Sequence, residues 1–337
     1  MPMVLPDVPA LILAPMEGVT DAPMRAVQGE VGAFTFAVSE FLRISQVVPP
    51  KSVFYRHMPE LRSGCLTQTN LPVQLQLLGG DAGRMAESAA IGHAAGATAI
   101  DLNFGCPAPT VNRHDGGATL LKYPTRIREI VAAVRAAVPR SVPVSAKMRL
   151  GWDTLEAIHE NAEMAAEGGA SWLTIHGRTR AVGYAPPIHW APIGRVREHL
   201  GIPVVANGDI WSIEDFRRCR DVTGCKHFML GRGALANPHL SYQVAAELGL
   251  RPAFPVPEPQ PSFDWSSLLK RLVEWSFRFP HTRPERTIRR LKQWLNLAAT
   301  FGNFTDFDAV KRTESLEEFF GKLGELGQDG SVYPTFR

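Results

Sequence analysis

The sequence predicts an α/β fold: a closed (β/α)8 TIM barrel followed by a small all-α C-terminal helical domain. Three observations predict it. Short apolar runs alternate with amphipathic helical patterns, unusual polar residues gather at the carboxyl ends of these runs, and the composition changes near residue 249. A barrel domain over residues 1–248, a proline-rich linker over 249–263 and a helical domain over 264–337 are therefore expected.

The apolar runs are short and β-rich, as buried strands are. They cover residues 11–14, 34–39, 73–78, 97–102, 143–148, 172–176, 203–206 and 227–230. Near-continuous apolar strands that alternate with helices indicate a parallel sheet covered on both faces. Eight such units favour a closed barrel over an open sheet. A Rossmann fold is the alternative, but no G-x-G-x-x-G motif follows the first run.

Amphipathic helices are expected between the strands, most clearly at residues 81–95, 124–138, 154–168, 192–200 and 212–222. In a TIM barrel the loops that follow the strands lie together on one face and build the active site. Seven of the eight runs carry polar or glycine-containing groups at their carboxyl ends. The sequence therefore predicts an active site on that face.

The chain beyond the barrel begins with five prolines between Arg251 and Ser262, which predict a stiff, extended linker. Helical patterns follow at residues 264–279, 282–300 and 306–323. The second of these helices has a recognisable start, with Thr282 as N-cap, Pro284 in the first turn and Glu285 closing a capping box.

Composition limits the class of protein. The 337 residues are 45% hydrophobic, which is ordinary for a globular protein with a sizeable core, and the net charge of +3 does not by itself indicate a nucleic-acid partner. No apolar stretch approaches the roughly 18–20 residues of a membrane span. The first fifteen residues lack the basic segment of a signal peptide. A cytoplasmic monomer without membrane association is expected.

Cysteine and histidine spacing gives no metal signature. The four cysteines share no C-x-x-C spacing, and the ten histidines form no H-x-x-x-H pair. No catalytic metal is expected. Cys219 and Cys225 fit the role of small buried hydrophobes.

The segment from Asn103 to Pro107 places a lone thiol, Cys106, on a tight turn directly after a buried run. A thiol there could act as a nucleophile or as a proton donor. The sequence offers no His–Asp partnership for a nucleophilic cysteine. A thiol with a pKa near ~8.5 is largely protonated at neutral pH and can serve as a general acid. The alternative is a merely buried thiol.

Two glycine turns end the last two runs, Asn207-Gly208-Asp209 and Gly231-Arg232-Gly233. In a barrel these loops form the usual phosphate cradle, to which Arg232 would add a bidentate cation. The alternative is that the glycines serve only tight turns.

Polar residues also interrupt other apolar runs. Lys147 must face an anion or an electron-rich acceptor, either a bound cofactor or a barrel carboxylate such as Asp101. Gln76 could contact a heteroaromatic ring edge or be a satisfied core amide. His176 precedes Gly177 and Arg178, which suggests a ligand contact beside the phosphate cradle, although a lone histidine is more often structural.

The helical domain is strongly basic. Eight Lys/Arg lie between Lys270 and Lys292, against two acids. On a helical wheel one face carries Arg283, Arg286, Arg289, Arg290 and Gln293, and the opposite face carries Ile288, Leu291, Leu295 and Ala298. A helix docked by its apolar stripe with arginines outward fits a phosphate backbone. A solvated charged face is the alternative.

Together these residues resemble the tRNA-dihydrouridine synthases over nearly the whole chain. The motifs that carry the resemblance are Leu13-Ala-Pro-Met-Glu-Gly18, Asp101-Leu-Asn-Phe-Gly-Cys-Pro107, Lys147-Met-Arg149, His176-Gly-Arg-Thr179, Asn207-Gly-Asp209 and Gly231-Arg-Gly-Ala234. Three further motifs resemble the bacterial C-type subfamily, which reduces uridine 16 of the D-loop: Leu150-Gly-Trp-Asp153, Gly183-Tyr184 and Leu291-Lys-Gln-Trp-Leu295.

The resemblance implies a flavin barrel that binds FMN, takes electrons from NADPH and reduces a uridine flipped out of tRNA. The implied FMN contacts are Pro15, Met16, Glu17, Gln76, Lys147, His176, Asn207, Gly208, Asp209, Gly231 and Arg232. Cys106 would protonate uracil C5 while hydride arrives at C6, and Asn103 and Arg149 would hold the uracil edge. The expected tRNA contacts are Arg43, Tyr184, Arg286, Arg290 and Lys292.

Two other functions remain open at this point. One is a flavin barrel that acts on a free small molecule, as dihydroorotate dehydrogenase does, which would not need the basic helical domain. The other is a non-catalytic tRNA-binding factor, which would not need the thiol, the lysine and the phosphate loops.

Overall fold

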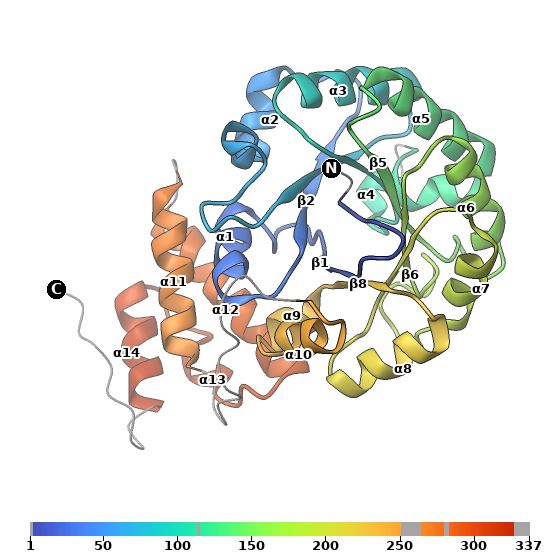
Figure 1. Cartoon of the computed structure of the whole chain (residues 1–337). Helices are drawn as coiled ribbons and strands as arrows, with labels where there is room; N and C mark the ends of the chain where they lie inside the picture. The colour runs from blue at the N-terminus through green and yellow to red at the C-terminus, as the bar shows by residue number, and fades with distance from the viewer. Residues whose placement is uncertain (1–2, 113–114, 251–263, 280–282, 327–337) are drawn as a thin grey trace.

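A computed structural model describes residues 3–112, 115–250, 264–279 and 283–326. Eight parallel strands form a closed barrel in sequence order, and β1 closes it by pairing with β8. The strands are β1 (Ala10–Leu13), β2 (Phe36–Arg43), β3 (Val73–Leu78), β4 (Ile100–Phe104), β5 (Val144–Arg149), β6 (Leu173–His176), β7 (Val204–Asn207) and β8 (His227–Leu230). Figure 1 shows the barrel ringed by helices. The predicted (β/α)8 architecture is confirmed.

The strand bounds follow the apolar runs closely, and β3 and β8 match the prediction residue for residue. β2 is longer than predicted because its pairing with β3 shifts register between Val38 and Phe41, which carries the strand on to Arg43. β4 starts later than predicted. Its first predicted residue, Ala97, donates its N–H to the carbonyl of Gly92 and so belongs to the end of the preceding helix.

Helices cover the outside of the barrel. The principal ones are α1 (Ala22–Val31), α3 (Ala82–Ala94), α5 (Pro124–Ala137), α6 (Ala157–Glu167), α7 (Ala191–His199), α8 (Ile213–Thr223) and α10 (Leu240–Glu247). Shorter elements lie in the loops: α2 (Lys51–His57), η1 (Pro59–Ser63), α4 (Pro109–Asn112), η2 (Gly117–Lys122) and α9 (Arg232–Ala236). Asp21, Asp81 and Ser212 cap α1, α3 and α8 through side-chain oxygens, as short polar residues do at helix starts.

The C-terminal part of the chain is helical, as predicted. It comprises α11 (Trp265–Arg278), α12 (Pro284–Phe301), α13 (Phe307–Val310) and α14 (Leu316–Leu326). The single helix predicted over residues 306–323 is wrong. Thr313 turns its hydroxyl back to the carbonyl of Val310, and Ser315 accepts from the N–H of Glu318, so the chain stops and restarts between α13 and α14.

Two other sequence-based expectations concern residues at the edge of the described chain. Arg283, rather than Thr282, occupies the N-cap position of α12, and it makes no side-chain cap. Thr282 lies outside the described residues, as does the proline-rich stretch from 251 to 263. The domain boundaries at 248 and 264 therefore stay a prediction.

The C-terminal helices pack against one side of the barrel. Met24 and Val27 of α1 and Leu235 of α9 share one buried apolar cluster with Leu272 and Leu291. The Trp294 indole donates to the carbonyl of Leu235 at 2.9 Å, which fixes α12 beside α9. Figure 1 shows α11 and α12 next to α1 and α9. Because α1 and α9 follow β1 and β8, α12 runs beside the carboxyl ends of these strands.

Candidate active site

A cavity of about 580 Å³ opens at the carboxyl ends of the strands, where a TIM barrel places its active site. Its wall contains most of the residues that the sequence singled out. These are Pro15, Met16, Glu17, Asn103, Cys106, Lys147, Arg149, His176, Tyr184, Asn207, Gly208, Asp209, Gly231 and Arg232. Residues from six strand ends thus meet in one chamber.

Five of the predicted site residues are not part of the cavity wall. Gln76 is fully buried inside the barrel, where both ends of its amide are hydrogen-bonded by protein groups. Arg43 is exposed at the end of β2 and donates to the carbonyl of Thr110 at 3.0 Å. Arg286 is exposed on α12.

Arg290 and Lys292 are the remaining two, and both point to protein partners. Arg290 donates to the carbonyls of Gly18 and Val19 and pairs with Asp21 at 3.0 Å, which leaves its side chain 13% exposed. Lys292 donates to the carbonyl of Thr313. The predicted arginine face of α12 is therefore divided: Arg283, Arg286 and Arg289 are exposed, and Arg290 joins the helix to the loop after β1.

Cys106 is a free, half-buried thiol in the cavity wall. Its turn is held by Asn103, whose side-chain oxygen accepts from the N–H groups of Gly105 at 3.0 Å and Cys106 at 2.9 Å. Burial raises the pKa of the Cys106 thiol, and the charge of Glu17 raises it further. The thiol therefore stays protonated at neutral pH, which suits a proton donor rather than a nucleophile.

Lys147 is half-buried and donates to the side-chain oxygen of Asn207 at 3.0 Å. Burial lowers the pKa of Lys147 to about 8, with the charge of Arg149 adding to the effect. The alternative of an ion pair with Asp101 is not realised, because Asp101 accepts from Ser145 and Gln76 instead. Among the described residues, Lys147 has no carboxylate within ion-pair distance.

His176 lies in the wall as a neutral imidazole. Burial lowers its pKa well below the usual value, and the charges of Arg149 and Lys147 add to the shift. Its Nδ1 is buried and has no hydrogen-bond partner among the described residues. A buried orphan acceptor or donor beside a cavity is what a polar ligand would satisfy.

Arg178 also has a buried nitrogen without a hydrogen-bond partner among the described residues. No role was predicted for it from the sequence. It is almost fully buried and pairs with Asp209, which also pairs with Arg232 at 3.2 Å. Its Nη1 has no partner within the described part of the chain. Its place in the His176-Gly-Arg motif was the available signal.

The glycines of the last two loops allow close packing. Gly208 has φ +116, and a Cβ there would lie 2.7 Å from Ile188 Cδ1 and 3.1 Å from His176 Nε2. A Cβ on Gly231 would lie 3.4 Å from the side chains of Ala14 and Met16. Close turns thus surround a donor set of Lys147, Arg149 and Arg232 in the cavity wall, against the carboxylates of Asp209 and Glu17. This excess of positive charge, together with the unpartnered Nδ1 of His176, fits an anionic ligand with a polar ring.

Aromatic side chains lie at the rim of the cavity. Tyr184 is 55% exposed and lies between two guanidinium groups, with Arg149 and Arg232 at 5.0 and 4.7 Å from its ring centre. Trp211 of the loop after β7 stacks on Phe301 at the end of α12. Leu297 of α12 also lines the cavity. Sequence reasoning missed these last three residues, and only the position of Trp211, two residues after Asp209, was a signal.

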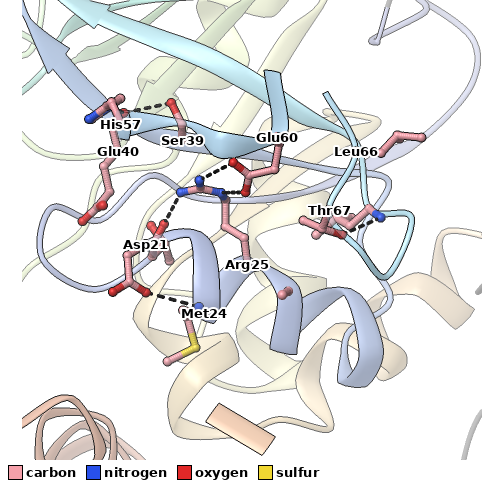
Figure 2. A network of polar contacts seen from close by, with 12 residues as sticks. Asp21, Met24, Arg25, Ser39, Glu40, His57, Glu60, Leu66 and Thr67 are labelled. Carbon is pink, nitrogen blue, oxygen red and sulfur yellow. Dashed lines mark hydrogen bonds and ion pairs between the residues drawn. The ribbon is translucent and has the colours of Figure 1, made fainter. Parts of the chain in front are cut away.

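A buried polar network supports the loop after β1, and Figure 2 shows Arg25 and Glu60 at its centre. The Arg25 guanidinium forms two bonds to Glu60, at 2.8 and 2.9 Å, and donates to the carbonyl of Thr20 at 2.7 Å. The Thr20 hydroxyl in turn accepts from the N–H of Met16. Nearby, burial and the charges of Asp21 and Glu17 raise the pKa of Glu40 to about 7. The network holds the segment that presents Met16 and Glu17 to the cavity.

Two kinds of feature are absent from the described residues. They contain no group of three or more His, Cys, Asp and Glu side chains arranged to hold a metal ion. None of their helices combines the length and apolar character needed to cross a membrane.

The chain is similar to proteins of known family. The family described as dihydrouridine synthase (Dus) matches residues 12–296. A tRNA-dihydrouridine(16) synthase of Pseudomonas putida is 44% identical over 286 residues, covering 85% of this chain and 86% of that protein. One of Ralstonia nicotianae is 39% identical over 331 residues, covering 95% and 98%. Histamine dehydrogenase from Rhizobium sp. 4-9 matches with a TM-score of 0.53 and 13% identity over 79% of this chain and 49% of its own, a likeness of fold alone.

Proposed function

This chain belongs to the dihydrouridine synthase family, and we propose that it reduces the C5–C6 double bond of a uridine in the tRNA D-loop, at position 16. One observation carries the proposal: a protonated thiol, Cys106, shares a cavity at the barrel mouth with the cations Lys147 and Arg149. The relatives named for position 16 support the choice of uridine. A cytoplasmic monomer is proposed with it.

The cofactor that we propose is FMN, with NADPH as the reductant. When bound, FMN would supply the hydride that C6 of the uracil accepts. Met16, Lys147 and Asn207 would hold its ring, and Lys147 would offset negative charge there. The phosphate would be held near Gly208, Gly231 and Arg232, with Pro15, Glu17 and Asp209 completing the wall. The unpartnered Nδ1 of His176, which lines the cavity, supports a polar ligand at this place.

Cys106 would give its proton to uracil C5. Its raised pKa keeps the proton available, and the positive charge of Arg149 would stabilise the thiolate left behind. Solvent would then restore the proton. Because Asn103 holds the N–H of Cys106, the thiol stays on a fixed turn during this step.

Arg149 would hold the uracil edge through its remaining nitrogen. Its Nε donates to Gly105 at 2.9 Å, and its Nη1 donates to the carbonyls of Thr179 and Gly183. These bonds leave Nη2 as the part of the fork not used by backbone. They also join the thiol turn to the loop that carries Tyr184.

We propose that tRNA contacts Arg43 and Tyr184 at the rim and the exposed arginines Arg283, Arg286 and Arg289 of α12. A polyanion fits these side chains because they are exposed and all but Tyr184 are positively charged. Arg290 and Lys292 are better suited to a positioning role, since protein groups already use their donors. The uridine would have to leave the base stack to reach the cavity.

The deciding experiment maps dihydrouridine, position by position, in tRNA from cells that lack this protein. Loss at position 16 alone is expected. An unchanged map would refute the proposed function. In parallel, NADPH oxidation by the purified protein is measured with unmodified tRNA and with free uracil or orotate. Turnover on the free base alone would favour the small-molecule alternative, and a protein that cannot be loaded with FMN would favour the non-catalytic one.

A further inference from the structure

A chain of three polar side chains runs from the barrel interior to the thiol turn. Asp101 of β4 is buried and accepts from Gln76 Nε2 at 2.7 Å. Gln76 Oε1 accepts from Asn103 Nδ2 at 2.9 Å. Asn103 Oδ1 then accepts from the backbone N–H groups of Gly105 and Cys106. Every link joins neighbouring strands or the turn that follows β4.

The groups at the two ends of this series of hydrogen bonds determine how the Gln76 and Asn103 amides are oriented. An ionised carboxylate can only accept, so Gln76 must turn its NH₂ group toward Asp101. Its oxygen therefore faces Asn103. At the other end the backbone N–H groups can only donate, so Asn103 must present its oxygen to Cys106. Both demands give the same orientation of the two amides, which makes the chain self-consistent.

Asp101 has no cationic partner to account for its burial. Its second oxygen accepts from the Ser145 hydroxyl at 2.5 Å, and Ser145 also accepts from Gln74. The described residues include no ion pair to Asp101. Burying a carboxylate without a cation costs free energy, so its hydrogen bonds must have a role that an apolar residue would not fill.

We propose that Asp101 is a positioning residue for the thiol, acting through the Gln76 and Asn103 amides to hold the Gly105–Cys106 turn. The proposal rests on the proposed function only in taking Cys106 as the proton donor. It also gives Gln76 a role that its place outside the cavity wall allows. Two simpler roles compete with it: a purely structural bond between β3, β4 and β5, and an electrostatic effect on Lys147, whose pKa the Asp101 charge raises.

The test measures the rate at which iodoacetamide alkylates Cys106 in the folded full-length protein as purified, with the modified cysteine located by mass spectrometry. The other three cysteines are buried, so the rate reports the turn. Asp101→Leu removes the acceptor and frees the amides, so alkylation should rise about tenfold as the turn loosens and the thiol is exposed. Asp101→Asn keeps an oxygen for Gln76 and an NH₂ for Ser145, and should restore the wild-type rate.

A double-mutant cycle separates the proposal from its competitors. Asn103→Leu should raise the rate as Asp101→Leu does, and the double variant should match Asn103→Leu alone. Additive effects, or an unchanged rate in Asp101→Leu, would overturn the proposal. Val205→Ala, a core truncation in β7, controls for loss of stability and should leave the rate unchanged. If Asp101→Leu does not fold, Gln76→Leu replaces it in the cycle with the same expected outcomes.

The alkylation rate needs neither tRNA nor turnover, so the two proposals can fail separately. A protein that makes no dihydrouridine, yet shows the non-additive cycle, would refute the proposed function and keep the positioning role.

Discussion

Trp211 and Phe301 stack with their ring centres 4.3 Å apart and their planes 14° from parallel. Trp211 belongs to the barrel loop after β7, and Phe301 ends α12. The Arg232 guanidinium lies over both rings, at 5.0 and 5.1 Å. This aromatic contact is thus one of those that join the helical part of the chain to the predicted phosphate cradle.

Phe301→Ala should lower the free energy of unfolding by about 0.5–1.5 kcal/mol from the lost ring pair, and by a further amount from the lost burial of a ring that is only 39% exposed. It should also weaken FMN binding, because Arg232 loses one of the faces that hold it. Urea unfolding and flavin fluorescence titration measure the two effects. Phe277→Ala, on an exposed ring of α11, is the control and should leave FMN affinity unchanged.

Cys106→Ala should bind FMN and tRNA as the wild type does and lose about 10²–10⁴-fold in dihydrouridine formation, the usual contribution of a general acid. Product formation is measured by mass spectrometry of tRNA under single-turnover conditions. Cys65→Ala removes a buried thiol away from the cavity and should retain activity. Undiminished product from Cys106→Ala would remove the thiol from the reaction.

The rate should fall on the alkaline side of its pH profile. The thiol must be protonated to act, and Lys147, with its pKa lowered to about 8, loses its charge in the same direction. Lys147→Arg keeps the charge at all these pH values, so any limb near pH 8 that arises from Lys147 should disappear and leave only the thiol limb at higher pH. A limb that stays in place would assign it to another group.

Arg286→Gln with Arg289→Gln should weaken tRNA binding and reduce the slope of log K against log salt by about one unit for each phosphate that is no longer neutralised. Filter binding between low and physiological salt gives the slope. Arg290→Gln is the matched contrast. It should leave the slope near the wild-type value and lower thermal stability, because its bonds to Gly18, Val19 and Asp21 join α12 to the barrel.

Arg25→Met should lower the free energy of unfolding by about 3–5 kcal/mol, because it leaves Glu60 buried without its cation. Arg25→Met with Glu60→Leu removes both charges and should recover much of that loss. Chemical denaturation measures both. Recovery of stability without recovery of FMN affinity would mean that Arg25 also fixes the loop of Met16 through Thr20.

The sequence predicted the barrel and most of the cavity wall for a physical reason. Each strand is an apolar run that ends in a polar or glycine turn, so the pattern alone puts Lys147, His176 and Asn207 on one face. The pattern could not tell that Arg290 turns inward while Arg286 stays outside, because a helical wheel does not say where the barrel lies. The break before Leu316 was hidden because apolar spacing continues from Phe307 through it.

The hydrogen-bond partners of Gln76 and Asn103 were also beyond reach from the sequence. Gln76 was predicted either to contact a ring edge or to be a satisfied core amide, and the family resemblance implied that Asn103 holds the uracil edge. Their partners include Asp101, which lies on the next strand and is visible only once the strand register is known. Trp211 and Phe301 illustrate the same difficulty, because ninety residues separate two rings that touch.

Leu297 gives the cavity a wall that the barrel alone does not supply. In a truncated chain that ends before α11, the cavity would therefore be open to solvent on this side, and the chain would not be a smaller enzyme. Because Trp211 of the barrel stacks on Phe301 of α12, a chimera that exchanges the C-terminal helices between two relatives should keep this contact only when the residue at position 211 is exchanged with them.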